Sequence, residues 1–202
     1  MSRVIAEMKE TTLTIEQIES LLVNDPESAF YIRRNIVVPN VDWGFLNHEA
    51  DLLVLSKSGY LTEIEIKRTW SDFKADFEKK HDHYDKKLSH FYYAVPESIG
   101  EKVFDWLFEG SYENRRYGSL RYGQSHVIKP TANNPHECGL ILYSDPDAYH
   151  NRGCFGINVQ AKRMGNYKIS KDEELKLLRL LGMRVWRLKD KIARLQEKTL
   201  FG

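Results

Sequence analysis

Residues 49–67 read EADLLVLSKSGYLTEIEIK and contain two short apolar runs separated by a turn. The first run, DLLVL, begins at Asp51, and the SKSG segment after it has the composition of a tight turn. The second run alternates charged and apolar side chains: Glu63, Ile64, Glu65, Ile66 and Lys67. Because side chains two apart in a strand share a face, we predict a hairpin whose isoleucines enter a core and whose acids and lysine share the other face.

The spacing within this hairpin brings charged side chains together. Asp51 lies fourteen positions before Glu65, so the start of one strand should lie near the end of its antiparallel partner. Carboxylate oxygens suit hard divalent cations such as Mg²⁺, and Lys67 could orient a water or offset charge on a phosphate. Ordinary solvated patterning, which an antiparallel edge also shows, is the alternative. The position of Asp51 favours a metal site.

The same residues carry a resemblance to a known family. Asp51 followed by Glu65-Ile66-Lys67 is similar to the D…(D/E)-x-K signature of the PD-(D/E)XK nuclease superfamily, with Ala50 where the superfamily name has proline. The chain from roughly residue 45 to residue 145 also resembles bacterial DNA-repair nuclease-like proteins of that superfamily. The later motifs occur in the same order: Ser71-Asp72-Phe73, Ala75-Asp76, Phe91 to Pro96 and Gly139-Leu140-Ile141.

The resemblance implies a restriction-endonuclease-like α/β fold, a mixed β-sheet flanked by helices. It implies a metal-dependent DNA nuclease, acting in DNA repair or in mobile-element or phage DNA processing. Asp51 and Glu65, with the Ile66 carbonyl, would hold Mg²⁺ or Mn²⁺, and Lys67 would position water or stabilise the transition state. Two alternatives stay open: a catalytically weak nuclease-like DNA-binding accessory protein, and a helix-mediated protein-interaction module.

Four further acids are candidates for the same site: Glu16, Glu19, Glu49 and Glu63. The superfamily often places an acid on the first helix, where Glu16 and Glu19 lie about one turn apart. A solvated helix face is the alternative for both. Glu63 would bind a metal through water or pair with Arg33 or Arg34 on a neighbouring strand.

Candidate DNA contacts lie in two segments. Lys80 and Tyr84 are four apart in a predicted helix, where some superfamily members have Gln and Tyr that help to hold DNA, so we place them at the rim of a DNA groove. Residues 112–129 interleave cations, which neutralise phosphates, with aromatic rings, which stack on bases. The candidates there are Arg115, Arg116, Tyr117, Arg121 and Tyr122. A surface loop with tyrosines packed on the sheet edge is the alternative.

Periodicity and capping residues predict the other elements. Helices are expected over 14–23 with Thr14 as cap, 71–87 with Ser71 as cap, 97–108, and 171–198 with Ser170 as cap. Strands are expected over 30–38, stopped by Pro39-Asn40, and over 90–95, 139–144 and 156–162. We therefore expect a nuclease-like α/β domain at 1–169, with an amphipathic helix at 170–202 as its extension.

The predicted last helix has apolar residues spaced alternately three and four apart: Leu178, Leu181, Val185, Leu188, Ile192 and Leu195. This spacing is typical of a narrow heptad seam. The seam could form a homodimer or pack along the domain itself. Basic residues dominate its flanks, so they could contact DNA or an acidic partner.

Composition sets the broad class. The chain has 202 residues, 42% of them hydrophobic, and a net charge of +1, so it should fold and any DNA-binding surface must be a local patch. Cys138 and Cys154 have no metal-ligand spacing and fit buried thiols in a reducing cytosol. Seven histidines show no zinc motif. With no signal peptide and no long apolar run, we expect a cytoplasmic protein without a membrane span.

Overall fold

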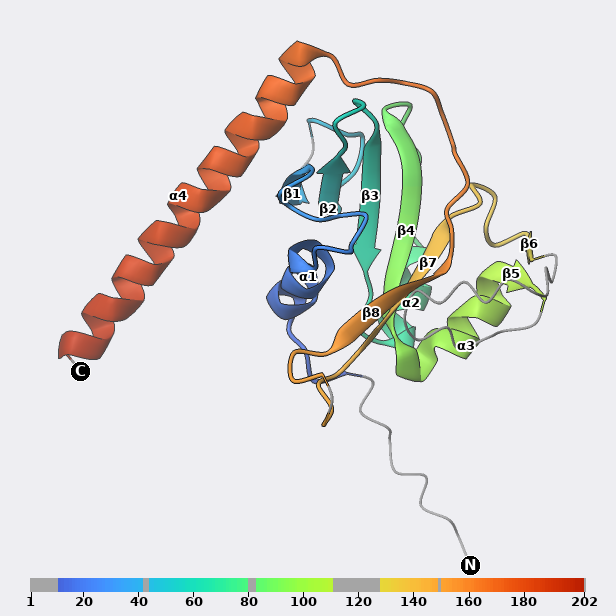
Figure 1. Ribbon diagram of the computed structural model, residues 1–202, viewed down its shortest axis with the longest axis horizontal. Helices are drawn as coiled ribbons and strands as arrows, with labels where there is room; N and C mark the ends of the chain where they lie inside the picture. Colours follow the sequence, from blue (N-terminus) through green and yellow to red (C-terminus); the bar gives the residue numbers. More distant parts are fainter. Residues whose placement is uncertain (1–10, 42–43, 80–82, 111–127, 149, 202) are drawn as a thin grey trace, which may run out of the picture.

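The computed structural model describes residues 11–41, 44–79, 83–110, 128–148 and 150–201. Six strands form one sheet in the order β1-β2-β3-β4-β7-β8 (Figure 1). They are β1 (Ile36–Val41), β2 (Ala50–Leu55), β3 (Leu61–Ile66), β4 (Leu88–Pro96), β7 (Gly139–Ser144) and β8 (Cys154–Val159). The helices are α1 (Ile15–Asn24), α2 (Trp70–Asp76), α3 (Glu97–Leu107) and α4 (Lys171–Phe201). Two short strands, β5 (Phe108–Glu109) and β6 (Lys129–Pro130), pair separately.

The sheet is mixed. Strands β1, β2 and β3 form an antiparallel meander, and β7 and β8 are also antiparallel. In the centre, β3 is parallel to β4 and β4 is parallel to β7, and the crossovers that parallel pairs require contain α2 and α3. The prediction of an α/β fold with a mixed sheet flanked by helices is therefore confirmed, as is the β2–β3 hairpin.

The two faces of the sheet bury different clusters. On one face, Ile64 and Ile66 share a buried cluster with Ile18 and Leu22 of α1. On the other face, α2 and α3 cover a cluster that includes Phe73, Phe104 and Leu140. The alternation in β3 thus sends its isoleucines into the core under α1, as predicted, and its charged residues to the face that α2 covers.

The helix starts follow their capping residues. At α1, the Gln17 N–H donates to Thr14 Oγ1 and the Thr14 N–H donates to the Gln17 side chain, so the predicted cap is a capping box. At α4, the Glu173 N–H lies 3.3 Å from Ser170 Oγ, and the Ser170 N–H donates back to the Glu173 carboxylate at 2.9 Å. Both predicted helix starts are confirmed.

Among the described side chains of α4, those that pack on the sheet lie near the start of the helix. Leu177 is fully buried in a third cluster with residues of β1, β2 and β3, and Leu180 and Leu181 pack against that cluster. One turn further, the Arg184 guanidinium donates to the Asn40 carbonyl at the end of β1. Beyond this contact α4 diverges from the sheet (Figure 1).

Three predicted elements were wrong in extent. The strand expected at 30–38 begins only at Ile36, because the residues before it form turns in which the Tyr31 N–H donates to the Ser28 carbonyl and the Arg34 N–H donates to the Tyr31 carbonyl. The strand then continues through Pro39 to Val41. Proline is tolerated there because β1 is an edge strand. The strand expected at 156–162 is β8, Cys154–Val159.

The helix expected at 71–87 is much shorter. Its cap is Thr69 rather than Ser71, since the Asp72 N–H donates to Thr69 Oγ1 at 3.0 Å, and it ends at Asp76. The tertiary contacts of Asp76 and His83, described below, replace the expected helical turns.

Other expectations concern the cysteines and the membrane. Cys138 is buried, as predicted, whereas Cys154 is half-buried, and both are free thiols. In the part of the chain that the structure describes, no helix is long and apolar enough to cross a membrane.

Candidate metal centre at the end of the hairpin

Asp51 marks the place where the two hairpin strands part. The regular pairing of β2 with β3 ends at Leu52 and Ile64. Asp51 directly precedes Leu52 in β2, and its Oδ2 accepts a hydrogen bond of 2.8 Å from the Ile66 N–H. The carboxylate therefore replaces a backbone acceptor, and this contact holds it beside the end of β3. Burial is the main cause that raises the pKa of Asp51.

Glu65 faces the same place from β3. It is 5% exposed, and its Oε1 accepts a hydrogen bond of 2.8 Å from Lys67 Nζ. Its Oε2 is buried and has no hydrogen-bond partner among the described residues. Burial, and then the negative charge of Asp51, raise the pKa of Glu65 to about 7.

The first helix adds a third carboxylate. Glu19 on α1 is half-buried, and burial together with the charge of Asp51 raises its pKa to about 7. Its Oε1 is also buried without a hydrogen-bond partner in the described part of the chain. Glu16 is exposed in the first turn, where a backbone N–H and the Thr14 side chain lower its pKa. Of the two acids proposed on this helix, the structure therefore brings Glu19 towards Asp51.

Asp51 is the carboxylate that acts on both of the other two acids, and Lys67 is the cation beside them. The negative charge of Asp51 adds to burial in raising the pKa of Glu19 and of Glu65, and each of these two acids has one buried oxygen that accepts no hydrogen bond from the described residues. A buried, unpartnered carboxylate oxygen is costly, whereas a hard divalent cation would satisfy it. Mg²⁺ often takes only one or two carboxylates and keeps several waters, so it does not need all three acids as direct ligands. The residues present fit such an ion.

Lys67 is held as a cation beside the acids. It is 4% exposed, and its Nζ donates to Glu65 Oε1 at 2.8 Å and to Asp76 Oδ1 at 2.9 Å. Burial opposes its charge, but the two carboxylates outweigh burial and raise its pKa. Lys67 is therefore suited to donate hydrogen bonds and to offset negative charge, and it is unsuited to accept a proton.

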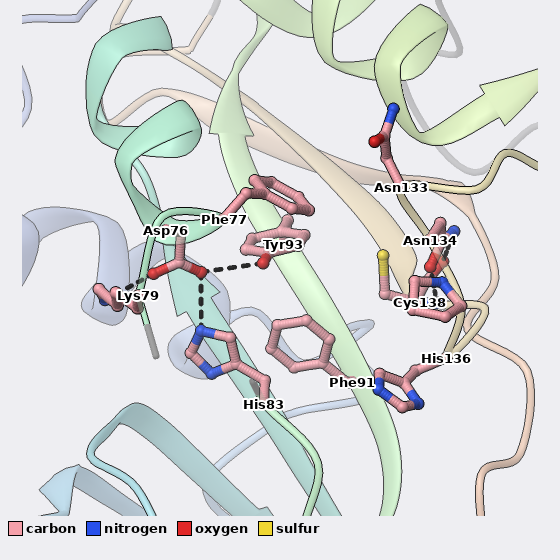
Figure 2. Close-up of a pocket in the computed structure, with 11 residues that line it drawn as sticks. Asp76, Phe77, Lys79, His83, Phe91, Tyr93, Asn133, Asn134, His136 and Cys138 are labelled. Atoms are coloured by element: carbon pink, nitrogen blue, oxygen red, sulfur yellow. Dashed lines mark hydrogen bonds and ion pairs between the residues drawn. The ribbon is translucent and has the colours of Figure 1, made fainter. Parts of the chain in front are cut away.

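A buried hydrogen-bond network holds Asp76, the second carboxylate that Lys67 contacts. Asp76 Oδ2 accepts from His83 Nε2 at 2.7 Å and from the Tyr93 hydroxyl at 2.9 Å (Figure 2). His83 Nδ1 lies 2.7 Å from Glu63 Oε1, and Glu63 Oε2 lies 2.7 Å from His48 Nε2. Burial disfavours the charge of His83, but Asp76 and Glu63 raise its pKa to about 10. A protonated His83 thus donates to carboxylates on both sides.

Two trios within this network have ligand-type atoms within 4.8 Å of one another: His48–Glu63–His83 and Glu65–Asp76–His83. Several of these atoms are already paired with one another at 2.7 Å, and Lys67 Nζ lies on Glu65 and Asp76. A metal ion there would have to displace those protons. We therefore regard the trios as hydrogen-bonded groups and place the metal candidate at Asp51, Glu65 and Glu19.

Two of the other candidate acids behave differently from the expectation. For Glu63, the alternatives were a metal contact through water and a pair with Arg33 or Arg34. The arginine pair is wrong, because the two oxygens of Glu63 contact His83 and His48. Arg34 instead donates to backbone carbonyls of the turn before β1. Glu49 is exposed and stands outside the cluster.

Four residues of the network were missed by sequence reasoning: His48, Asp76, His83 and Tyr93. Asp76 and Tyr93 lie inside the motifs quoted for the superfamily resemblance, which was the signal that could have drawn attention to them. The two histidines lie 15 and 20 residues from Glu63, and no spacing rule connects them to it.

Asp76 and His83 also line a cavity of about 150 Å³ (Figure 2). Phe77, Phe91 and Tyr93 provide aromatic rings in its lining. An apolar cavity of this size can hold a six-membered ring. Beside it, Tyr84 stacks on His136, a lining residue, with ring centroids 5.0 Å apart.

The structure brings Tyr84 near this cavity, and it does not describe the other proposed DNA contacts. Lys80, Arg115, Arg116, Tyr117, Arg121 and Tyr122 lie outside the described residues.

Comparisons with known proteins give no family. No family model matches the chain, and no curated protein matches it. One solved structure that resembles it is the SPO1766 protein of unknown function from Silicibacter pomeroyi. The two are 15% identical, with a TM-score of 0.45, over 80% of this chain and 82% of that chain.

Proposed function

We propose that the protein is a metal-dependent DNA nuclease of PD-(D/E)XK type, in which Asp51, Glu65 and the Ile66 carbonyl hold Mg²⁺ or Mn²⁺. The observation that carries the proposal is the pair of buried carboxylate oxygens, on Glu19 and Glu65, that lack a partner among the described residues. They belong to acids whose pKa values the charge of Asp51 raises. A site that accumulates desolvated negative charge in this way is suited to a divalent cation.

The proposed chemistry divides the work among these residues. When bound, the metal ion supplies polarisation of the scissile phosphate and a bound water of lowered pKa. The Ile66 N–H fixes the orientation of Asp51 through its 2.8 Å hydrogen bond. Lys67, anchored by Asp76, donates to the oxygen on which negative charge develops. His83 and Tyr93 hold Asp76 in place and act as positioning residues.

The experiment uses the full chain with plasmid DNA and with single-stranded DNA, each with Mg²⁺, with Mn²⁺ and with excess EDTA. We expect cleavage with metal and none with EDTA. Glu49→Gln is a matched control, because Glu49 lies two residues before Asp51 but is exposed. A protein that binds neither ion in calorimetry and cleaves neither DNA would contradict the proposal.

One observation favours a second candidate, a nuclease-like DNA-binding accessory protein with little activity. Lys67 is 4% exposed and already contacts two carboxylates, so its access to a phosphate is restricted. Metal binding and DNA binding without cleavage of either substrate would select this candidate. Either activity would serve the proposed role in DNA repair or in mobile-element or phage DNA processing.

The DNA contacts of the proposal are tested by salt dependence. If Arg115, Arg116 and Arg121 bind phosphates, neutralising all three should weaken DNA binding for every sequence. It should also lower the salt slope by about one unit for each lost contact. Tyr117→Ala and Tyr122→Ala should weaken single-stranded binding more than duplex binding, because stacking needs an exposed base. An unchanged slope in the triple variant would remove this segment from the DNA site.

A further inference from the structure

The α4 stripe is the set of apolar residues spaced three and four apart along the last helix: Leu178, Leu181, Val185, Leu188, Ile192 and Leu195. Leu181 packs against the sheet, but the four residues after it are between 46% and 58% exposed. The stripe therefore continues along α4 past the point where the helix leaves the body of the protein (Figure 1).

The geometry of the stripe identifies the kind of surface that would cover it. Alternate spacing of three and four keeps one narrow seam facing a neighbouring helix along its whole length. A helix that stands alone in water is only marginally stable, and exposed leucines add a further cost. A second helix in knobs-into-holes packing would remove both costs.

The residues beside the stripe carry charge of one sign. With Leu178 and Val185 at heptad position a, the flanking e and g positions from 182 to 196 hold Gly182, Arg184, Lys189, Lys191 and Gln196. None of them is acidic. From residue 175 to residue 196 the single acid is Asp190, at position f on the side away from the stripe, where it pairs with Arg194 at 2.9 Å.

This charge pattern disfavours a second copy of the chain. In a parallel pair, g positions face e positions, so Lys191 would meet the neutral Gln196 of the other helix, and Lys189 would face Arg184, which already donates to the Asn40 carbonyl. In an antiparallel pair, e faces e and g faces g, so basic residues would again meet basic or neutral ones. Like charges across a helix pair are destabilising and act against the wrong partner. DNA would match the basic flanks but would leave the leucines in water.

We propose that the α4 stripe binds an amphipathic helix of another protein whose apolar heptad seam is flanked by Glu or Asp. The apolar stripe supplies affinity, and Lys189 and Lys191 supply selectivity through their charge. This inference goes beyond the proposed nuclease function and does not depend on it, because no residue of the metal site takes part.

The test uses the full chain and two synthetic peptides of about three heptads. Both have Leu at a and d, and they differ only at e and g, where one has Glu and the other Lys. We expect fluorescence anisotropy to show that the Glu peptide binds at least about tenfold more tightly. Lys189→Glu with Lys191→Glu should reverse that preference.

Matched variants separate the stripe from the rest of the helix. Leu188→Ser with Ile192→Ser should weaken binding of the Glu peptide about tenfold or more. Met183→Ser should leave it unchanged, because Met183 is similarly exposed but lies at position f. All three positions are exposed, so circular dichroism should show that every variant keeps its fold.

Three results would overturn the proposal. The first is equal binding of both peptides, or binding of neither. The second is a dimer of the free chain that Leu188→Ser with Ile192→Ser dissociates, because the occupant would then be a second copy. The third is duplex DNA binding that Lys189→Glu with Lys191→Glu abolishes and the double Ser variant retains.

Discussion

Glu63 and Glu65 are neighbours on one face of one strand, and they differ in what surrounds them. Glu63 is fully buried, and each of its oxygens contacts an imidazole at 2.7 Å. Glu65 is almost as buried, yet only one of its oxygens has a hydrogen-bond partner among the described residues. Both side chains are buried. They differ because both oxygens of Glu63 have partners, whereas one oxygen of Glu65 has no partner among the described residues.

The difference shows which buried charges point to a ligand. A buried carboxylate with all its partners present is part of the structure, as Glu63 is with His83 and His48. A buried carboxylate that retains an unpaired oxygen has a cost that the described residues do not offset, and a ligand is one way to offset it. The candidate site therefore lies at Glu65, although Glu63 belongs to the larger network.

The largest effect is expected at the two proposed metal ligands. Asp51→Asn or Glu65→Gln should reduce cleavage by at least about 10³-fold, as loss of one transition-state-stabilising group can. The metal-free melting temperature should stay the same or rise, because removing one of several crowded carboxylates relieves repulsion. Cleavage assays and thermal melts without metal measure both. A variant that cleaves as well as the parent would end the assignment.

The satisfied acid should respond in stability instead. Glu63→Ala leaves His83 and His48 without their carboxylate, and breaking a buried charged pair costs about 3–5 kcal/mol. Urea denaturation should show that loss, whereas Glu65→Gln should show none. Equal stability of Glu63→Ala and the parent would mean that the network is not a structural unit.

Lys67 links the two groups, because it contacts Glu65 directly and Glu63 through Asp76 and His83. Lys67→Ala should lower turnover about 10²-fold, the cost of one donor to developing charge. It should leave metal binding and DNA binding intact. Calorimetric titration with Mn²⁺ is the measurement. If metal binding is lost together with turnover, Lys67 is a structural counter-charge.

The smallest expected effect is on the pH dependence of stability, which should differ between the candidate metal-site acids and His83. Glu65 and Glu19 have folded pKa values raised from 4.5 to about 7. The folded chain then binds more protons than the unfolded chain between those values, so metal-free stability should fall as pH rises through that window. For His83, raised from 6.5 to about 10, the stabilisation is complete below 6.5 and is lost as pH rises through about 10.

Mg²⁺ should change the pH dependence of stability that arises from Glu19 and Glu65 and leave the one that arises from His83 unchanged. A bound cation keeps the carboxylates ionised, so it should remove the fall in stability below about pH 7 and leave the alkaline fall unchanged. Urea midpoints measured across the pH range, with and without Mg²⁺, provide the comparison. An effect of Mg²⁺ confined to the alkaline window would place the ion at the His83 network.

The sequence predicted those elements whose signals are local. The β2–β3 hairpin follows from the alternation of Glu63 to Lys67, and the starts of α1 and α4 follow from the caps Thr14 and Ser170. These features depend on residues within a few positions of one another.

Predictions from the sequence were wrong where contacts between residues distant in the chain determine the local structure. Helix propensity favours continuing α2 past Asp76, but that carboxylate is drawn to Lys67 and His83, and the helix ends there. For Glu63, neither of the two alternatives, a metal through water or an arginine, included a histidine, because no local rule places His48 and His83 beside it. Spacing in the sequence identifies the candidate acids. Which of their oxygens find hydrogen-bond partners depends on tertiary packing, which spacing does not predict.

The contact between α4 and β1 has a consequence for the solubility of the folded chain. An outer strand offers unpaired backbone groups to any other strand, which is a route to aggregation. β1 has no N–H at Pro39, and the φ of 51° at Asn40 interrupts the extended conformation of the strand. Arg184 takes up the Asn40 carbonyl. The first turns of α4 thus protect an edge of the sheet from growing by strand addition, whatever its exposed remainder binds.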